Sequence, residues 1–208
     1  MGITSRKKRP LRREIPHLRD TRLIIIASEG AVTEKKYFES SLFHSRRIQV
    51  KVLETEGGHS SPESVLNRLR AFKKEFQLSS SDRLWLAIDR DRWKEKNLHI
   101  ISANSRKMGA GLAVSNPCFE LWLYLHFEEW AEGCVSSVEI EKELRALLGS
   151  YNKSAPPIEL LSGKIGDASR RAEEMDLNQS LRWPENPGSH VYRLVKEINN
   201  LSGNRVYQ

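Results

Sequence analysis

Three short apolar segments, each followed by acidic or polar residues, constrain the fold of this 208-residue chain more than any other feature. They are LIIIASEG at residues 23–30, LWLAIDRD at residues 84–91 and LAVSNPCFE at residues 112–120. Each apolar run has the length and composition of a buried strand. Ligands of open α/β sheets bind just outside the carboxyl ends of the strands. If the three strands are parallel in one sheet, the sequence predicts that their polar ends converge on one site.

The acids that would converge are Glu29, Asp89 and Asp91. Side chains at i and i+2 of a strand point to the same side, so Asp89 and Asp91 can bind one cation together or two neighbouring cations separately. Gly30 allows a tight turn behind Glu29. Carboxylate oxygens suit Mg²⁺ or Mn²⁺, and paired ions stabilise both oxygens of a phosphodiester cleavage. Asp-x-Asp alone is also typical of a solvated turn, but three acids at strand ends favour a metal site.

Several further residues have two interpretations each. Glu34 and Glu120 lie at expected helix starts, where an acid either joins the metal site or complements the helix dipole. Asn116 either orients its loop or acts as a ligand through its amide oxygen. Lys153 either neutralises a scissile phosphate or is an ordinary exposed lysine. His59, in a Gly-Gly-His-Ser loop, is either a general base or a solvated histidine.

The net charge of +7 is unevenly distributed, because residues 1–22 contain eight basic and two acidic residues. A basic arm on a near-neutral body is common among nucleic-acid-binding proteins, although a solubilising tail has the same composition. Arg90 and Arg92 flank the Asp-x-Asp segment, and the adjacent Trp93 either stacks on a base or anchors the loop. The predicted nucleic-acid contacts are Arg6, Lys7, Lys8, Arg9, Arg12, Arg13, Arg90 and Arg92.

Composition excludes other classes of protein. At 38% hydrophobic residues the chain can build a core, yet it has no apolar run of about 20 residues for a membrane helix. Its start lacks an apolar secretory region. Cys118 and Cys134 are expected to be reduced, and no Cys/His spacing indicates zinc. We therefore expect a cytoplasmic protein.

Strand and helix patterns alternate up to about residue 135. Periodicity predicts a helix over about 34–43 with Thr33 as its cap, and another over 98–108. It also predicts a strand at 48–54 and a helix that begins at Ser61-Pro62. Residues 119–127 fit either a strand or a helix, and Pro117 favours a helix.

Beyond residue 135 we expect helices only. A capping box opens one at Ser136, with Ile140, Leu144, Leu147 and Leu148 inside; others are expected at 165–175 and after a Ser189 cap. The order predicts an α/β fold with a small, mostly parallel sheet of about four strands, helices on both faces and C-terminal helices. The expected domains are a basic arm at 1–20, an α/β core at 21–135 and a helical extension at 136–208 packed on the core.

Combined motifs over about residues 20–200 closely resemble the RloB-like family, a bacterial defence and abortive-infection family of the Toprim superfamily. The resemblance implies a Toprim fold in which Glu29 and the Asp89/Asp91 pair are metal-site acids. The matching segments are Ser28-Glu29-Gly30-x-x-Thr33-Glu34-x-x-Tyr37-Phe38, Asp89-x-Asp91, Ser115-Asn116-Pro117-Cys118-Phe119-Glu120-Leu121-Trp122, Tyr151-Asn152-Lys153, Arg171-Ala172 and Asn186-Pro187-Gly188-Ser189.

Members of the Toprim superfamily include nucleases, topoisomerases and primases, and this chain favours the first. A topoisomerase needs a separate domain with a nucleophilic tyrosine, and 208 residues leave little room for one. A bacterial primase normally adds a zinc-binding domain, which two cysteines cannot supply in that form. We expect a Mg²⁺- or Mn²⁺-dependent endonuclease acting on DNA, tRNA or another RNA. The resemblance also implies an ATPase partner of the ABC or overcoming-lysogenisation-defect type. The alternative is a non-catalytic nucleic-acid-binding or adaptor subunit of such a complex.

Deleting residues 1–20 should flatten the salt dependence of nucleic-acid binding, because fewer counterions are released when fewer phosphates are neutralised. The measurement is the slope of log affinity against log salt concentration for the full and truncated chains. An unchanged slope would leave the arm as a solubility tail or a partner-docking segment.

Overall fold

The computed structural model describes residues 21–55, 61–91, 93–130 and 136–203. The predictions made for the basic arm at 1–20 and for His59, Arg92 and Cys134 lie outside these ranges. None of the helices in the described ranges combines the length and the apolar character that a membrane span requires.

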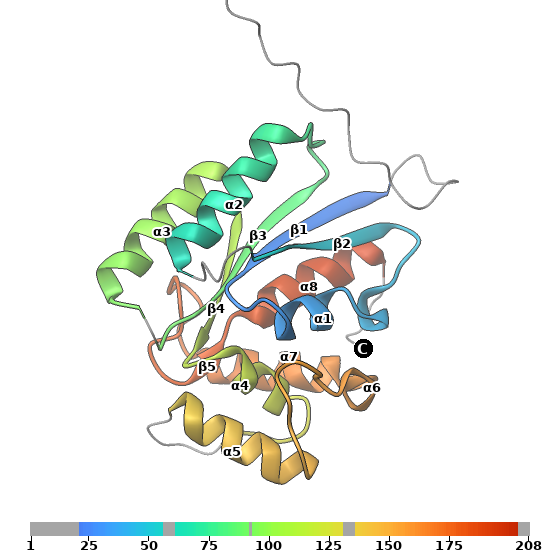
Figure 1. The fold of residues 1–208 in the computed structure, drawn as a ribbon, viewed down its shortest axis with the longest axis vertical. Helices are drawn as coiled ribbons and strands as arrows, with labels where there is room; N and C mark the ends of the chain where they lie inside the picture. Colours follow the sequence, from blue (N-terminus) through green and yellow to red (C-terminus); the bar gives the residue numbers. More distant parts are fainter. Residues whose placement is uncertain (1–20, 56–60, 92, 131–135, 204–208) are drawn as a thin grey trace, which may run out of the picture.

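A five-stranded sheet forms the centre of the molecule, with the strand order β2-β1-β3-β4-β5 (Figure 1). The first four strands in sequence are parallel to their neighbours, and β5 is antiparallel to β4. The predicted α/β class, with a mostly parallel sheet and C-terminal helices, is confirmed. The strands are β1 (Arg22–Ser28), β2 (Ile48–Leu53), β3 (Arg83–Asp89), β4 (Gly111–Asn116) and β5 (Gly188–Ser189).

The expectation of no strand after residue 135 was wrong. β5 contains two residues, in which Ser189 pairs with Ser115 and Gly188 with Asn116. So short a strand has no alternating pattern for the sequence to display. Its position is set by β4, which offers it a free edge.

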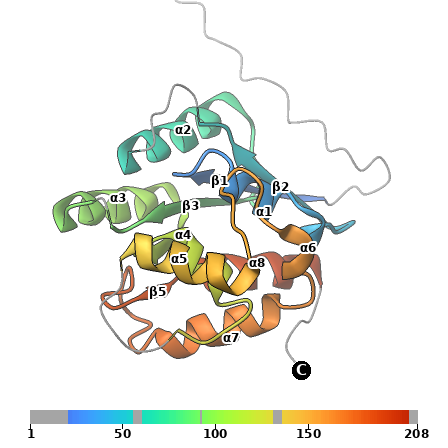
Figure 2. The ribbon, with the colours of Figure 1, turned by 60° about the horizontal axis from the view of Figure 1, so that its bottom comes forward.

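Helices cover both faces of the sheet, as Figures 1 and 2 show. One face packs against α2 and α3; the other packs against α1, α4 and α8. Outside these, α5 contacts α4 and α7 contacts α8. The helices are α1 (Thr33–Phe38), α2 (Pro62–Glu75), α3 (Glu95–Met108), α4 (Phe119–Tyr124), α5 (Ser137–Leu148), α6 (Ile158–Leu161), α7 (Ile165–Met175) and α8 (Val191–Ser202), with a 3₁₀ turn η1 (Ser41–Phe43).

Several helix boundaries follow the local signals in the sequence. Ser61 accepts a hydrogen bond from the Ser64 amide at 3.2 Å, one residue before Pro62 opens α2. The capping box of Ser136 and Glu139 is present at the start of α5. Residues 119–124 are helical, which resolves the ambiguity of that apolar segment.

Other local predictions were wrong. The helix expected over 34–43 is interrupted, because α1 ends at Phe38 and a 3₁₀ turn follows. Thr33 lies inside α1, where its hydroxyl donates to the Lys153 carbonyl at 2.7 Å instead of capping the helix. Leu147 is 39% exposed, whereas Ile140 and Leu144 are buried as expected.

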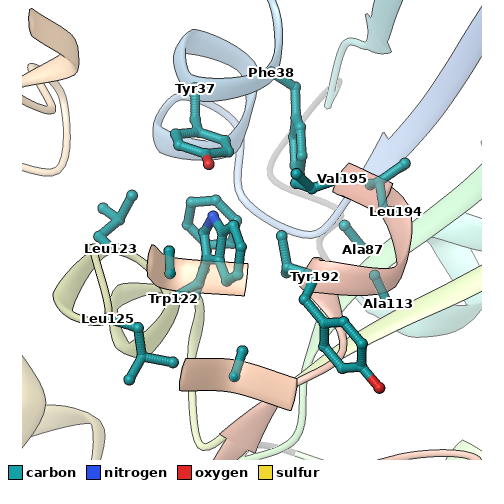
Figure 3. Close-up of a cluster of buried hydrophobic side chains, with 14 of the residues drawn as sticks. Tyr37, Phe38, Ala87, Ala113, Trp122, Leu123, Leu125, Tyr192, Leu194 and Val195 are labelled. Carbon is teal, nitrogen blue, oxygen red and sulfur yellow. The ribbon is translucent and has the colours of Figure 1, made fainter. Parts of the chain in front are cut away.

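Buried aromatic residues join the helices of the α1/α4/α8 face (Figure 3). Tyr37 from α1 packs edge-on against Trp122 from α4, with ring centroids 6.3 Å apart. The Tyr37 hydroxyl also lies 3.0 Å from Nε2 of the buried His126. Tyr192 and Val195 place α8 in the same cluster. The C-terminal segment therefore contributes β5 and α8 to the central core.

Gly111→Ala should destabilise the fold by roughly 1–3 kcal/mol, the usual cost of overpacking. Gly111 pairs with Trp85 on β3, and an added Cβ would lie 2.5–2.6 Å from three carbon atoms of the indole. The measurement is urea unfolding. In a Trp85→Leu background the same change should cost much less; an equal cost in both backgrounds would contradict this packing argument.

Candidate active site

The sheet order creates a topological switch point between β1 and β3. From β1 the chain moves to β2 on one side, and α2 then returns it to β3 on the other side. Ligands of doubly wound sheets bind at this point, outside the carboxyl ends of the strands. Glu29 directly follows β1 and Asp89 is the last residue of β3, so these two of the predicted metal-site acids lie there.

Hydrogen bonds hold Glu29 against the end of β3. Its amide donates to the Ala87 carbonyl at 2.9 Å, which continues the pairing of β1 and β3. Its Oε2 accepts from the Asp89 amide at 3.3 Å and from Trp93 Nε1 at 3.0 Å. Glu29 is 5% exposed. The Trp93 indole thus anchors this acid, a role that neither of its two sequence-based interpretations named.

Glu34 projects from the first turn of α1 towards the same site. Its Oε1 accepts from the Gly30 amide at 2.8 Å. A Cβ on Gly30 would lie 1.9 Å from Glu34 Oε2, so a side chain there would collide with the carboxylate. Gly30 is not among the described glycines with positive φ. The glycine is needed for close approach and not for the tight turn that the sequence suggested.

Glu120 lies in the first turn of α4 and is 5% exposed. The Tyr151 hydroxyl donates to its Oε1 at 3.2 Å, and Lys153 Nζ is 3.2 Å from the same oxygen. Lys153 also contacts Glu141 on α5 at 2.5 Å. The 151–154 loop therefore joins α5 to the acidic site.

Asp91 lies at the exposed side of the site. Its carboxylate accepts a hydrogen bond from Ser137 at the start of α5. Its amide donates to the Pro117 carbonyl at 3.2 Å. Within the described ranges, no three His, Cys, Asp or Glu side chains are close enough as they stand to hold one metal ion.

The acids nevertheless interact strongly through their charges. Burial, followed by the charges of Glu34, Glu29, Glu120 and Asp91, raises the pKa of Asp89 well above its usual range. Among the described residues, none donates a hydrogen bond to the Asp89 carboxylate. The site therefore holds more negative charge than the protein alone compensates.

Burial also raises the pKa of Glu34, to about 7, and the charges of Glu120 and Glu29 add to this effect. Hydrogen bonds from the Glu34 and Gly30 amides oppose the shift. Burial, with the charges of Glu120 and Asp89, raises the pKa of the Cys118 thiol, which keeps it protonated and unsuited to act as a nucleophile.

Asn116 and Arg90 fasten a neighbouring loop. Asn116 Nδ2 donates to the carbonyls of Pro184, Glu185 and Asn186 at 2.9–3.1 Å. Arg90 donates to the first two of these carbonyls, at 3.0 and 2.6 Å. Asn116 thus orients this loop, which is one of its two predicted roles. The Arg90 guanidinium, which the sequence predicted to contact nucleic acid, instead donates to carbonyls of the same loop.

Three residues that touch the acids were not predicted as members of the site: Ser137, Tyr151 and Trp93. Ser137 and Tyr151 are far from the acids in sequence, and their contacts depend on where α5 and its following loop pack. The proximity of Trp93 to Asp91 in the sequence was one signal, and the Tyr151-Asn152-Lys153 motif of the family resemblance was another.

This fold and site define an α/β protein of Toprim-like architecture, with acids gathered at the carboxyl edge of its sheet. A family model described as RloB-like protein matches residues 24–198, and the chain belongs to that family. Comparisons with curated proteins and with solved structures found no match.

Glu34→Gln should reduce the pH dependence of stability of the metal-free protein. Because the pKa of Glu34 rises from 4.5 to about 7 on folding, the wild type should lose stability as the pH rises between these values. The loss from this residue amounts to roughly 3 kcal/mol once it is complete. Glutamine keeps an acceptor for the Gly30 amide without the charge, so the variant should be more stable than the wild type at pH 7.

The measurement is urea unfolding between pH 4.5 and 7.5, roughly the range spanned by the two pKa values, in the presence of a chelator. Glu159→Gln, at an exposed acid of α6, is the matched control. A stability difference between wild type and Glu34→Gln that stays constant over this range would show that burial and the neighbouring charges do not raise the pKa of Glu34 on folding.

Proposed function

We propose that this protein is a Mg²⁺- or Mn²⁺-dependent nuclease that cleaves phosphodiester bonds as the effector of a bacterial anti-phage system. The crowding of Glu29, Glu34, Asp89 and Glu120 at the switch point is the observation that supports this function most directly. Burial, with the added repulsion between these carboxylates, raises the pKa of Asp89 and Glu34. A site that stores uncompensated carboxylate charge favours a divalent cation as its ligand.

The donors fit such a cation in chemistry, because they are carboxylate oxygens on neighbouring strand and helix ends. Glu29 and Asp89 would be its central ligands, with Glu34, Asp91 and Glu120 around them. When bound, the ion would supply charge stabilisation to the phosphate and lower the pKa of water. Since no three of the described side chains are poised together, side-chain adjustment must accompany binding.

The remaining residues would position these acids and the substrate. Trp93 and the Asp89 amide fix the Glu29 carboxylate, and the Gly30 amide fixes Glu34. The Lys153 side chain is 48% exposed and lies beside Glu120. It can therefore exchange its contact with Glu141 for a substrate phosphate without leaving the site.

The family resemblance supports an ATPase partner. The sequence Gly57-Gly58-His59-Ser60 lacks the Gly-Lys-Ser/Thr end of a phosphate-binding loop, so energy coupling would come from another chain. The exposed apolar residues Val138 and Leu147 on α5 favour that helix as part of the docking surface. Through Ser137 and Lys153, α5 and its following loop contact the acids, which gives a docked partner a route to the site.

Asp89→Asn should reduce cleavage on the order of 100-fold or more, because it removes a ligand charge at the centre of the site. The assay follows single-stranded DNA, duplex DNA and tRNA in Mg²⁺, in Mn²⁺ and in chelator, with and without the cognate ATPase. Asp167→Asn, at an exposed acid of α7, is the matched control.

Nucleic-acid binding without cleavage under every condition would instead favour a non-catalytic adaptor. Cleavage by the isolated wild type equal to that with the ATPase would exclude a partner switch while leaving the nuclease function intact.

A further inference from the structure

A groove of about 260 Å³ lies between α2 and α3. The two helices pack against each other on the same face of the sheet (Figure 1). Trp93 lines the groove, and its Nε1–H donates to Glu29. The groove and the acidic site therefore share this residue.

The floor of the groove is apolar and its rim is polar. Leu66 from α2 and Ile101 from α3 form the floor and are 1% and 3% exposed, while Ile100 is 49% exposed. Asn97 and Asn104 lie on the same face of α3 as Ile100 and Ile101, and both line the groove. Within the described part of the chain, no protein group forms a hydrogen bond with the side-chain amide of either asparagine.

The charges of the groove disfavour an anion as its ligand. Its lining contains one acid, Glu63, and one base, Arg70, so the formal charge is zero. The volume is below the roughly 300–1,000 Å³ of pockets for drug-sized ligands. A neutral, flat and polar-edged group, such as one heterocyclic ring system, matches this combination of floor, amides and size.

We propose that the groove binds one unpaired nucleobase of the strand that is cleaved at the acidic site. This inference rests on the proposed nuclease function and specifies its substrate class. Amide side chains match the mixed donors and acceptors of base edges, and an aromatic or apolar surface suits the base plane. A base in the groove cannot remain in a duplex, so the substrate is single-stranded or unpaired beside the scissile phosphate.

The test measures binding of short single-stranded DNA and RNA by fluorescence anisotropy in chelator, with all variants in an Asp89→Asn background. Ile100→Glu, which puts a charge on the rim without touching the core, should weaken binding roughly 5- to 100-fold. Leu160→Glu, at a 53% exposed apolar residue of α6, introduces the same charge elsewhere and should leave affinity unchanged. Asn104→Ala should also weaken binding and alter base preference.

An abasic nucleotide moved along the oligonucleotide identifies the bound base. At one position it should weaken binding to the protein with the wild-type groove but not to the Ile100→Glu variant. Equal losses in both proteins, equal effects of Ile100→Glu and Leu160→Glu, or equal affinity for duplex and single strand would overturn the base site. Groove-dependent binding by a wild type that never cleaves would refute the nuclease function and leave the base site standing.

Discussion

The structure at the carboxyl edge depends on keeping several carboxylates close together although their charges repel. The protein offsets part of this repulsion with fixed donors: the Asp89 amide and Trp93 for Glu29, and the Gly30 amide for Glu34. Each donor belongs to the backbone or to the Trp93 indole, and each orients one carboxylate at the site. Burial and the remaining repulsion together raise the pKa of Asp89 well above its usual range. Such arrangements are typical of functional sites, where stability is given up for a specific ligand.

The C-terminal segment completes this site as well as covering the sheet. Thr33 and Lys36 on α1 donate to the carbonyls of Lys153 and Ser154, and Tyr151 and Lys153 contact Glu120. The 151–154 loop thus connects α1, α4 and α5 over one group of acids. Because the same loop meets Glu141 on α5, a displacement of that helix would change the charge next to Glu120.

Local sequence signals determined most of the fold. The apolar runs that become β1, β3 and β4 are long and end in polar residues. The capping residues Ser61 and Ser136 mark the positions where α2 and α5 begin. These signals depend on nearest neighbours in the chain. The position of β5, the outward orientation of Leu147 and the interruption after α1 depend on tertiary packing, so the sequence pattern could not reveal them.

The same distinction applies to the candidate site. Glu29 and Asp89 could be placed together because parallel strands align their carboxyl ends. The reason for a glycine at position 30 could not be predicted, because it depends on the close approach of the Glu34 carboxylate from the next helix. Likewise, the donors Tyr151 and Ser137 come from a segment whose packing over the sheet edge has no local signature.

The acidic site and the adjacent groove impose different requirements on a nucleic acid. A phosphate is repelled by the ionised carboxylates until a cation compensates them, whereas the groove is formally neutral and apolar at its floor. The proposed base binding therefore needs no metal, and it would hold a strand beside the acids before the phosphate is stabilised there. Because Trp93 lines the groove and also donates to Glu29, occupation of the groove would bear on the orientation of that carboxylate. The proposed base site and the proposed metal site would thus be coupled through one residue.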